Sequence, residues 1–225
     1  MPIKIMTFAS LLFIPFFTES PVKQIIPKQF VVKEISSHTF SLNNRYGNSF
    51  VNNVFKENIL LTIKYTSDKK IDSNNIDWDK INKPFKYSMV LKPDEIFAFH
   101  DDVLPEYQNK IDKTTNSHFN LSEGFKSDGY LAGDGVCHLA SLLYWVAKDA
   151  NLEATAPTRH DFMKIPEIPS EFSVSIYSNP YDKGSVNQLQ NLYIKNNKNN
   201  EIIFEFIYNG EDLSIKATEK MLKTL

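Results

Sequence analysis

Cysteine is almost absent from this chain: Cys137 is the only one among 225 residues. A disulfide within the chain is therefore excluded, and so is a metal site built from several thiolates. A lone thiol is a buried hydrophobe, one half of an intermolecular bridge or a nucleophile. The residues around Cys137 must decide between these roles.

An excess of charge of one sign is also missing. Lys and Arg number 25 and Asp and Glu 27, which gives a formal net charge of −2. No strongly basic face is implied, so nucleic acid is not an expected partner. Hydrophobic residues make up 42% of the chain, with 17 Phe and 10 Tyr. This is enough apolar material for the core of one large soluble domain.

A long apolar run occurs only at the N-terminus. Lys4 precedes Ile5–Phe17, in which only three residues are not apolar. This pattern predicts a signal peptide or uncleaved anchor at residues 1–20. At 1.5 Å per residue the run spans about 20 Å, which is short for a permanent membrane helix. A buried N-terminal strand or helix is the alternative.

An extracytoplasmic protein is therefore expected, secreted or membrane-anchored, with membrane contact only through this N-terminal segment. Residues 21–37 are predicted to form a linker and a first strand. The main domain is predicted at 38–217, followed by a C-terminal tail at 218–225.

Glycine is scarce as well, with seven in the chain, but three lie within seven residues: Gly129, Gly133 and Gly135. Such a loop permits positive φ angles and a close approach of the backbone to a ligand. The next segment, residues 135–150, carries apolar residues over most of its helical circumference. It predicts a central helix that is covered on several sides.

The rest of the chain predicts an α+β fold, with this helix (about 136–150) packed on mostly antiparallel strands. Residues 208–211 (Tyr-Asn-Gly-Glu) predict a hairpin turn, and residues 92–94 a second turn. β-rich runs between polar stretches predict the strands: residues 30–32, 59–65, 171–177, 189–195, 202–208 and 213–217.

The start of the predicted helix carries the most chemistry. There the unpaired backbone N–H groups and the helix dipole favour a thiolate at Cys137. His160 follows where the chain can return toward this end, so its imidazole is a candidate base. Asp161 or Asp134 could orient the imidazole. The alternative is a structural cysteine in the core, since free cysteine is among the most buried residue types.

Other residues are candidates for binding a ligand. His138 points about 100° away from Cys137 on a helix and could face a pocket near the helix start. A metal site at His100, Asp101 and Asp102 lacks further ligands nearby, so no metal and no cofactor are expected. The candidate binding residues are Gly133, Asp134, Gly135, His138, Arg159 and Tyr130.

Several segments together resemble the VanW-like family, named after an accessory protein of certain vancomycin-resistance gene clusters. The signature GGGVCQ and its following helix are matched by GDGVCHLASLLYWVAKDANLE, residues 133–153. Residues 43–48, 91–99 and 159–160 match further family segments in the same order. The departures are Asp134 for a Gly and His138 for a Gln, together with Asp161-Phe162 for a His-Ser.

The resemblance implies a bacterial envelope protein associated with the cell wall, and it does not name a reaction. One hypothesis is acyl transfer or hydrolysis on a cell-wall peptide, with Cys137 as nucleophile. A second is a non-catalytic module that binds a cell-wall peptide or glycan. A third is a structural or assembly partner in an envelope complex. The position of the Cys137 sulfur relative to a cleft and an imidazole discriminates between them.

Overall fold

The structure is a computed structural model, and it describes residues 29–67, 71–129, 131–179 and 185–223. The predicted N-terminal signal, residues 21–28 of the predicted linker and Tyr130 lie outside these residues. Within the described ranges, no helix has the length and apolar character needed to cross a membrane.

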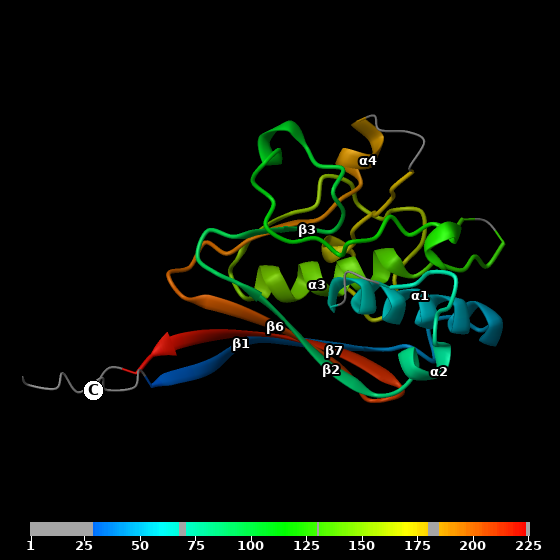
Figure 1. Cartoon of the computed structure of the whole chain (residues 1–225), viewed down its shortest axis with the longest axis horizontal. Helices are drawn as coiled ribbons and strands as arrows, with labels where there is room; N and C mark the ends of the chain where they lie inside the picture. The colour runs from blue at the N-terminus through cyan, green and yellow to red at the C-terminus, as the bar shows by residue number, and fades with distance from the viewer. Residues whose placement is uncertain (1–28, 68–70, 130, 180–184, 224–225) are drawn as a thin grey trace, which may run out of the picture.

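Helices and antiparallel strands are both present, which confirms the predicted α+β class (Figure 1). The helices are α1 (Ser49–Ser67), α2 (Trp78–Ile81), α3 (Val136–Asp149) and α4 (Ser185–Leu189). The strands are β1 (Phe30–Ser41), β2 (Phe85–Leu91), β3 (Ile96–Ala98), β4 (Glu153–Thr155), β5 (Tyr193–Lys195), β6 (Glu201–Tyr208) and β7 (Asp212–Leu222). Three short 3-10 turns cover Pro105–Tyr107, Leu121–Glu123 and Ser170–Phe172.

The larger sheet has the order β1-β7-β6-β2, and all of its pairs are antiparallel. Burial alternates along β6, so Phe204 and Phe206 face the core while their neighbours are partly exposed. The turn between β6 and β7 is the predicted one. Gly210 adopts a φ of 109°, and the side chain of Asn209 accepts hydrogen bonds from the amides of Glu211 and Asp212. These features allow the tight reversal.

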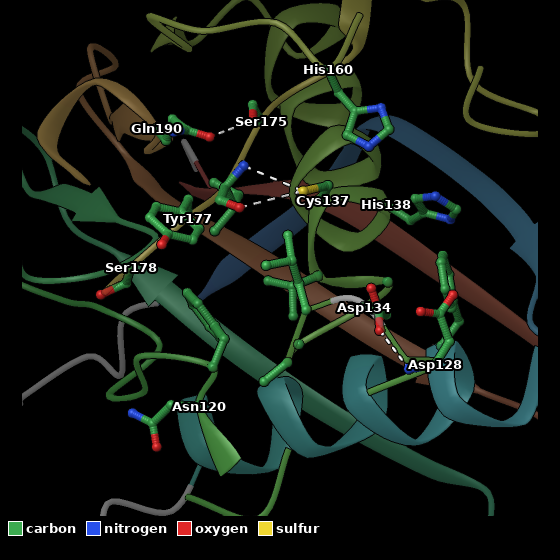
Figure 2. A pocket seen from close by; sticks show the side chains of 18 of the residues that line it. Asn120, Asp128, Asp134, Cys137, His138, His160, Ser175, Tyr177, Ser178 and Gln190 are labelled. Carbon is green, nitrogen blue, oxygen red and sulfur yellow. Dashed lines mark hydrogen bonds between the residues drawn. The ribbon is translucent and has the colours of Figure 1, made fainter. Parts of the chain in front are cut away.

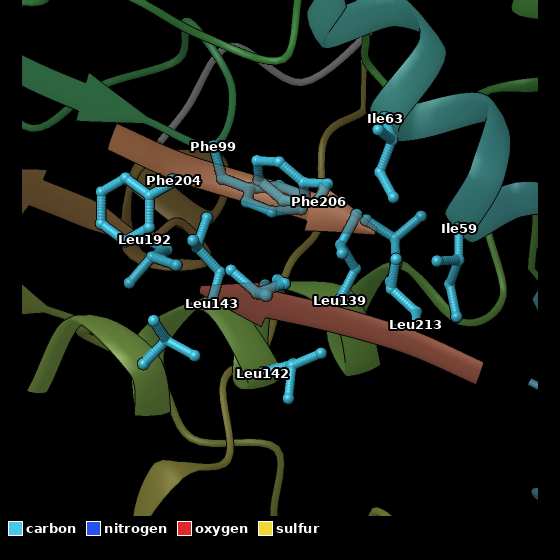
Figure 3. Packing of buried hydrophobic residues seen from close by; sticks show 14 of the residues in the cluster. Ile59, Ile63, Phe99, Leu139, Leu142, Leu143, Leu192, Phe204, Phe206 and Leu213 are labelled. Carbon is cyan, nitrogen blue, oxygen red and sulfur yellow. The ribbon is translucent and has the colours of Figure 1, made fainter. Parts of the chain in front are cut away.

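Helix α3 is the predicted central helix, and it is largely buried as expected. It lies across one face of the larger sheet, and the smaller sheet β3-β5-β4 lies on its other side (Figure 1). Figure 3 shows Leu139 and Leu143 of α3 among Phe204, Phe206 and Leu213 of the larger sheet. A helix covered on both sides is apolar around most of its circumference, which explains the pattern in the sequence.

One predicted strand is wrong, because residues 59–65 belong to helix α1. Asn48 begins this helix, since its side chain accepts from the amides of Phe50 (2.9 Å) and Val51 (3.4 Å). Ile59, Leu60, Leu61 and Ile63 are each at most 2% exposed. The periodicity of a short continuous apolar run does not distinguish a buried strand from a buried helix. Here the run continues the helical turns that begin at Ser49.

The strand predicted at residues 171–177 is also absent. A 3-10 turn at Ser170–Phe172 is followed by extended chain that pairs with no named strand. Its amides bind elsewhere: Ser175 donates to the oxygen of Thr158, and Tyr177 donates to the oxygen of Gln190. The strand predicted at 189–195 is limited to Tyr193–Lys195. The extended segment 173–179 is important because its residues 175–179 line the candidate site.

Candidate functional site

The glycine loop before α3 has the backbone conformation that the sequence predicts. Gly133 and Gly135 have φ angles of 85° and 95°, in the left-handed region. A Cβ on Gly135 would lie 2.9 Å from the Cα and the oxygen of Phe55 in α1, and one on Gly133 would lie 2.8 Å from Phe119. Gly135 is therefore needed for α3 to begin against α1, and Gly133 for the loop to pass Phe119.

A pocket of about 590 Å³ opens at this end of α3 (Figure 2). Six of the predicted site residues line it: Gly133, Asp134, Gly135, Cys137, His138 and His160. The remaining walls come from distant parts of the chain, including Tyr46, His118 and residues 175–179. The topology thus gathers residues that are more than 100 positions apart in sequence.

The Cys137 side chain is half-buried and lies in the pocket wall. Its thiol donates to the oxygen of Ile176 (3.5 Å), and the amide of Ile176 donates to the sulfur (3.3 Å). Burial raises the pKa of the thiol to about 11, and the nearby charge of Asp134 acts in the same direction. The expectation of a lowered pKa is therefore wrong: desolvation outweighs the helix dipole, so the resting group is a thiol.

His160 presents a neutral imidazole to the pocket. Its Nδ1 lies 2.9 Å from the oxygen of Met163, which can only accept, so Nδ1 carries the proton. Burial lowers the pKa of His160, and its Nε2 then keeps a lone pair. Figure 2 shows this ring at the same end of α3 as Cys137, and both residues line the pocket. No hydrogen bond joins the sulfur to an imidazole among the residues the structure describes.

His138 is only 2% exposed and has partners on both ring nitrogens. Arg45 Nε donates to its Nδ1 (2.7 Å), and its Nε2 lies 3.3 Å from the hydroxyl of Tyr46. Burial, and then the positive charge of Arg45, lower the pKa of His138 well below its usual value. With both nitrogens engaged, His138 is not available as the base for Cys137.

Two carboxylates share the wall of the pocket. Asp134 accepts a hydrogen bond from the amide of Asp128 (2.8 Å), which holds the loop between them. Burial raises the pKa of Asp134 to about 6, and the neighbouring Asp128 also contributes. His118 also lines the pocket and binds Asp101 (2.7 Å) and Glu123 (3.1 Å), which together raise its pKa to about 10.

Two predicted residues lie apart from the pocket lining. The Asp161 side chain is 72% exposed and lies 3.6 Å from Nε of Arg159. Arg159 also donates to the oxygen of Ser170 (2.9 Å). The orienting role expected of Asp161 is filled by the main chain of Met163. Tyr130 lies outside the described residues.

Sequence reasoning missed three contributors to the site. Met163 and Ile176 act through main-chain groups, which leave no signature in side-chain identity. Tyr46 carried a signal, because it lies within the Asn-Arg segment at residues 43–48 that was matched to the family. The contact of that segment with the site depends on the fold, which places Arg45 against His138 of α3.

A metal role has no geometric support within the described residues, where no group of three or more His, Cys, Asp or Glu side chains could hold an ion. His100 is buried, and its ring contacts the main-chain oxygen of Gln190 and the side chain of Asn191. It therefore braces the loop at residues 100–102.

Comparison with known proteins gives one match. Among curated proteins and among solved structures, the searches find no match. A family profile described as "VanW like protein" matches residues 87–218, which is more than half of the chain and includes α3 and its glycine loop. This chain therefore belongs to the VanW-like family.

Proposed function

We propose that this protein is an extracytoplasmic cysteine-dependent enzyme that transfers or hydrolyses acyl groups of cell-wall peptides. One observation carries the proposal. The pocket brings the only thiol of the chain together with an imidazole whose Nδ1–H is bound to a main-chain oxygen. That arrangement leaves Nε2 of His160 as a proton acceptor toward the pocket.

The proposed reaction begins with the protonated thiol. The Cys137 sulfur attacks a substrate carbonyl carbon while Nε2 of His160 takes the thiol proton, and a tetrahedral adduct forms. The carbon–nitrogen bond then breaks, the leaving amine takes the proton from Nε2, and an acyl group remains on sulfur as a thioester. Water or a second amine then attacks the thioester carbon and releases Cys137.

The raised pKa of Cys137 fits a general-base mechanism better than a preformed ion pair. The thiol must leave the oxygen of Ile176 and turn toward His160 when a substrate enters. Catalytic hydrogen bonds are often long or absent before substrate binds. The amide of Ile176 remains beside the sulfur through this rotation and can stabilise developing negative charge.

The cell-wall substrate and the location outside the cytoplasm are part of the proposal. They are supported by the family and by the apolar run at residues 5–17 after Lys4. Fractionation of cells that express a tagged full chain tests the location. Recovery in membrane or external fractions is expected, and recovery in the cytosol alone would contradict it.

Mass spectrometry of the intact protein after incubation with soluble wall peptides tests the chemistry. The wild type should gain the mass of an acyl group, and Cys137→Ala should not. His160→Gln should slow acylation by about 10²-fold or more, which is typical for loss of a general base. The exposed residue Lys148, replaced by Ala, is the matched control.

A second function, non-catalytic binding of a wall peptide or glycan, is favoured by the two hydrogen bonds between the thiol and Ile176. These bonds give Cys137 a structural role in holding segment 173–179 against α3. If wall peptides bind to wild type and to Cys137→Ala with equal affinity and no adduct forms, the protein is a binding module.

A further inference from the structure

The hydroxyl group of Tyr46 ends a chain of hydrogen bonds that begins at a buried arginine. Arg45 is 3% exposed, and its other guanidinium nitrogens donate to the oxygens of Ser41 (2.8 Å) and Pro166 (2.9 Å). Its Nε donates to Nδ1 of His138 (2.7 Å). Because a guanidinium has no acceptor, Nδ1 of His138 must be unprotonated.

The direction of the next bond follows from the first. A neutral imidazole with a bare Nδ1 carries its proton on Nε2. That proton is given to the hydroxyl oxygen of Tyr46 (3.3 Å). The hydroxyl therefore accepts from inside the protein, and its own proton is left to donate.

The Tyr46 ring is held in place at the pocket wall. The side chain of Asn52 binds both main-chain polar groups of Tyr46, at 2.8 Å and 2.7 Å. Phe55 packs edge-on against the ring at 5.3 Å between centroids. Tyr46 lines the pocket, and among the described residues no acceptor takes its hydroxyl proton.

We infer that Tyr46 is a specificity-determining residue whose hydroxyl donates a hydrogen bond to a neutral oxygen of the ligand, a peptide carbonyl. The charge of the wall favours this acceptor, since Asp128 and Asp134 line the same pocket and repel a carboxylate. The cationic His118 on that wall is already paired with Asp101 and Glu123. Arg45 and His138 are positioning residues that polarise the hydroxyl and fix its direction. The choice of a peptide ligand rests on the proposed function.

Position 138 offers a matched pair of variants. A glutamine amide can accept from Arg45 through Oε1 and donate to Tyr46 through Nε2, so both hydrogen bonds keep their direction. A leucine fills similar space and removes both bonds. His138→Gln should therefore behave as wild type, and His138→Leu should behave as Tyr46→Phe.

Calorimetric titration of a synthetic wall stem peptide tests the inference, with Cys137→Ala in the full chain to prevent chemistry. Tyr46→Phe should weaken binding about 3- to 10-fold, the range for one neutral hydrogen bond. His138→Gln should stay within about twofold. Unchanged affinity in Tyr46→Phe would overturn the inference. Binding without any acyl adduct in the wild type would instead remove the proposed chemistry and leave the role of Tyr46 intact.

Nitrogen-15 NMR of the histidine rings tests the directions of these hydrogen bonds without a ligand. His138 should show an unprotonated Nδ1 and a protonated Nε2 from pH 5 to 8, and Tyr46→Phe should perturb the Nε2 signal. A proton on Nδ1, or a charged ring at pH 7, would contradict the proposed directions of the hydrogen bonds from Arg45 to Tyr46. Either result would overturn the inference even if no peptide binds.

Discussion

The thiol of Cys137 occupies the first turn of α3, where the helix dipole favours negative charge. Burial of the sulfur, and to a smaller extent the charge of Asp134, act against that effect, whereas the backbone hydrogen bonds of Ile176 and Cys137 favour the thiolate. The dipole contributes a few tenths to about 1 kcal/mol at such a position, whereas burial of a charge without a partner costs several kcal/mol. Desolvation therefore determines the protonation state of the free protein.

Alkylation by iodoacetamide should report this state directly. With a pKa of about 11 in place of the ordinary 9.0, the thiolate fraction at pH 7 is lower by about a hundredfold. Labelling of the native protein should be slow at pH 7 and should rise with pH up to about 11. Fast labelling at pH 6–7 would show that a thiolate is already present. The urea-unfolded chain is the control for intrinsic reactivity.

Asp134 should make the protein more stable in mild acid than at neutral pH. Its pKa is raised from 3.8 to about 6, so the folded state binds the proton more tightly than the unfolded state does. Its stabilising contribution is present below about pH 3.8 and is lost as pH rises toward 6. Asp134→Asn keeps an acceptor for the amide of Asp128 and should unfold at a higher temperature than wild type at pH 7.

Thermal unfolding between pH 4.5 and 7.5 is the measurement, and the difference between wild type and variant isolates the contribution of Asp134. The exposed residue Asp161, replaced by Asn, is the matched control. A variant whose pH profile is parallel to that of the wild type would mean that Asp134 titrates normally.

At the scale of elements, the entry to α3 depends on backbone that only glycine adopts readily. Gly135→Ala combines a φ of 95° with a Cβ 2.9 Å from the α1 backbone. The expected loss is at least about 2 kcal/mol in the free energy of unfolding. Gly47→Ala is the control, because nothing lies within 4 Å of an added Cβ there, and it should change stability by less than about 0.5 kcal/mol. Chemical denaturation measures both, and equal effects would contradict the packing argument.

The elements that could be predicted are those with a strong local signal. Helix α3 follows a glycine loop and is apolar all round, and β6 and β7 alternate across an Asn-Gly turn. The second half of helix α1 is wrongly predicted as a strand at residues 59–65, because ten residues separate this buried run from the helix cap at Asn48. The strand predicted at residues 171–177 is wrong because the amides of this extended chain bind single groups of residues 137, 141, 158 and 190 and no neighbouring strand.

The site was predictable only in part, for the same physical reason. Cys137, His138 and His160 lie within 24 residues of each other, so one helix and one connector place them together. Tyr46 reaches the same pocket, and Arg45 reaches the buried ring of His138, through long-range packing. The groups that hold the thiol and the base, Ile176 and Met163, contribute only main-chain atoms.

For the whole molecule, the described chain before the family match belongs to the same core. The match begins at residue 87, yet β1 pairs with β7 along its length and α1 contacts α3. Phe40 of β1 is 1% exposed and lies under the guanidinium of Arg45, at 4.1 Å from its ring centroid. Residues 29–67 and 87–218 should therefore unfold together.

Phe40→Ala should lower the free energy of unfolding by about 3–5 kcal/mol, the range for a truncated core aromatic. Unfolding in urea, followed by circular dichroism and by tryptophan fluorescence, should still show one coincident transition at a lower midpoint. Phe50→Ala, at a residue 59% exposed, is the control. Two separate transitions would mean that the N-terminal part folds as its own unit.

The antiparallel pairing of β1 with β7 also sets how the protein carries mechanical load. The two described ends of the chain lie side by side, since Phe30 pairs with Leu222 and Lys223 donates to the oxygen of Gln29. In Figure 1 these ends project on the left, whereas the loop before α3 lies on the right. A pull between the two ends would open the ladder one hydrogen bond at a time. A pull between the N-terminal end and a ligand held in the pocket would instead act along the strands, across hydrogen bonds that are perpendicular to them, and would load these bonds together in shear.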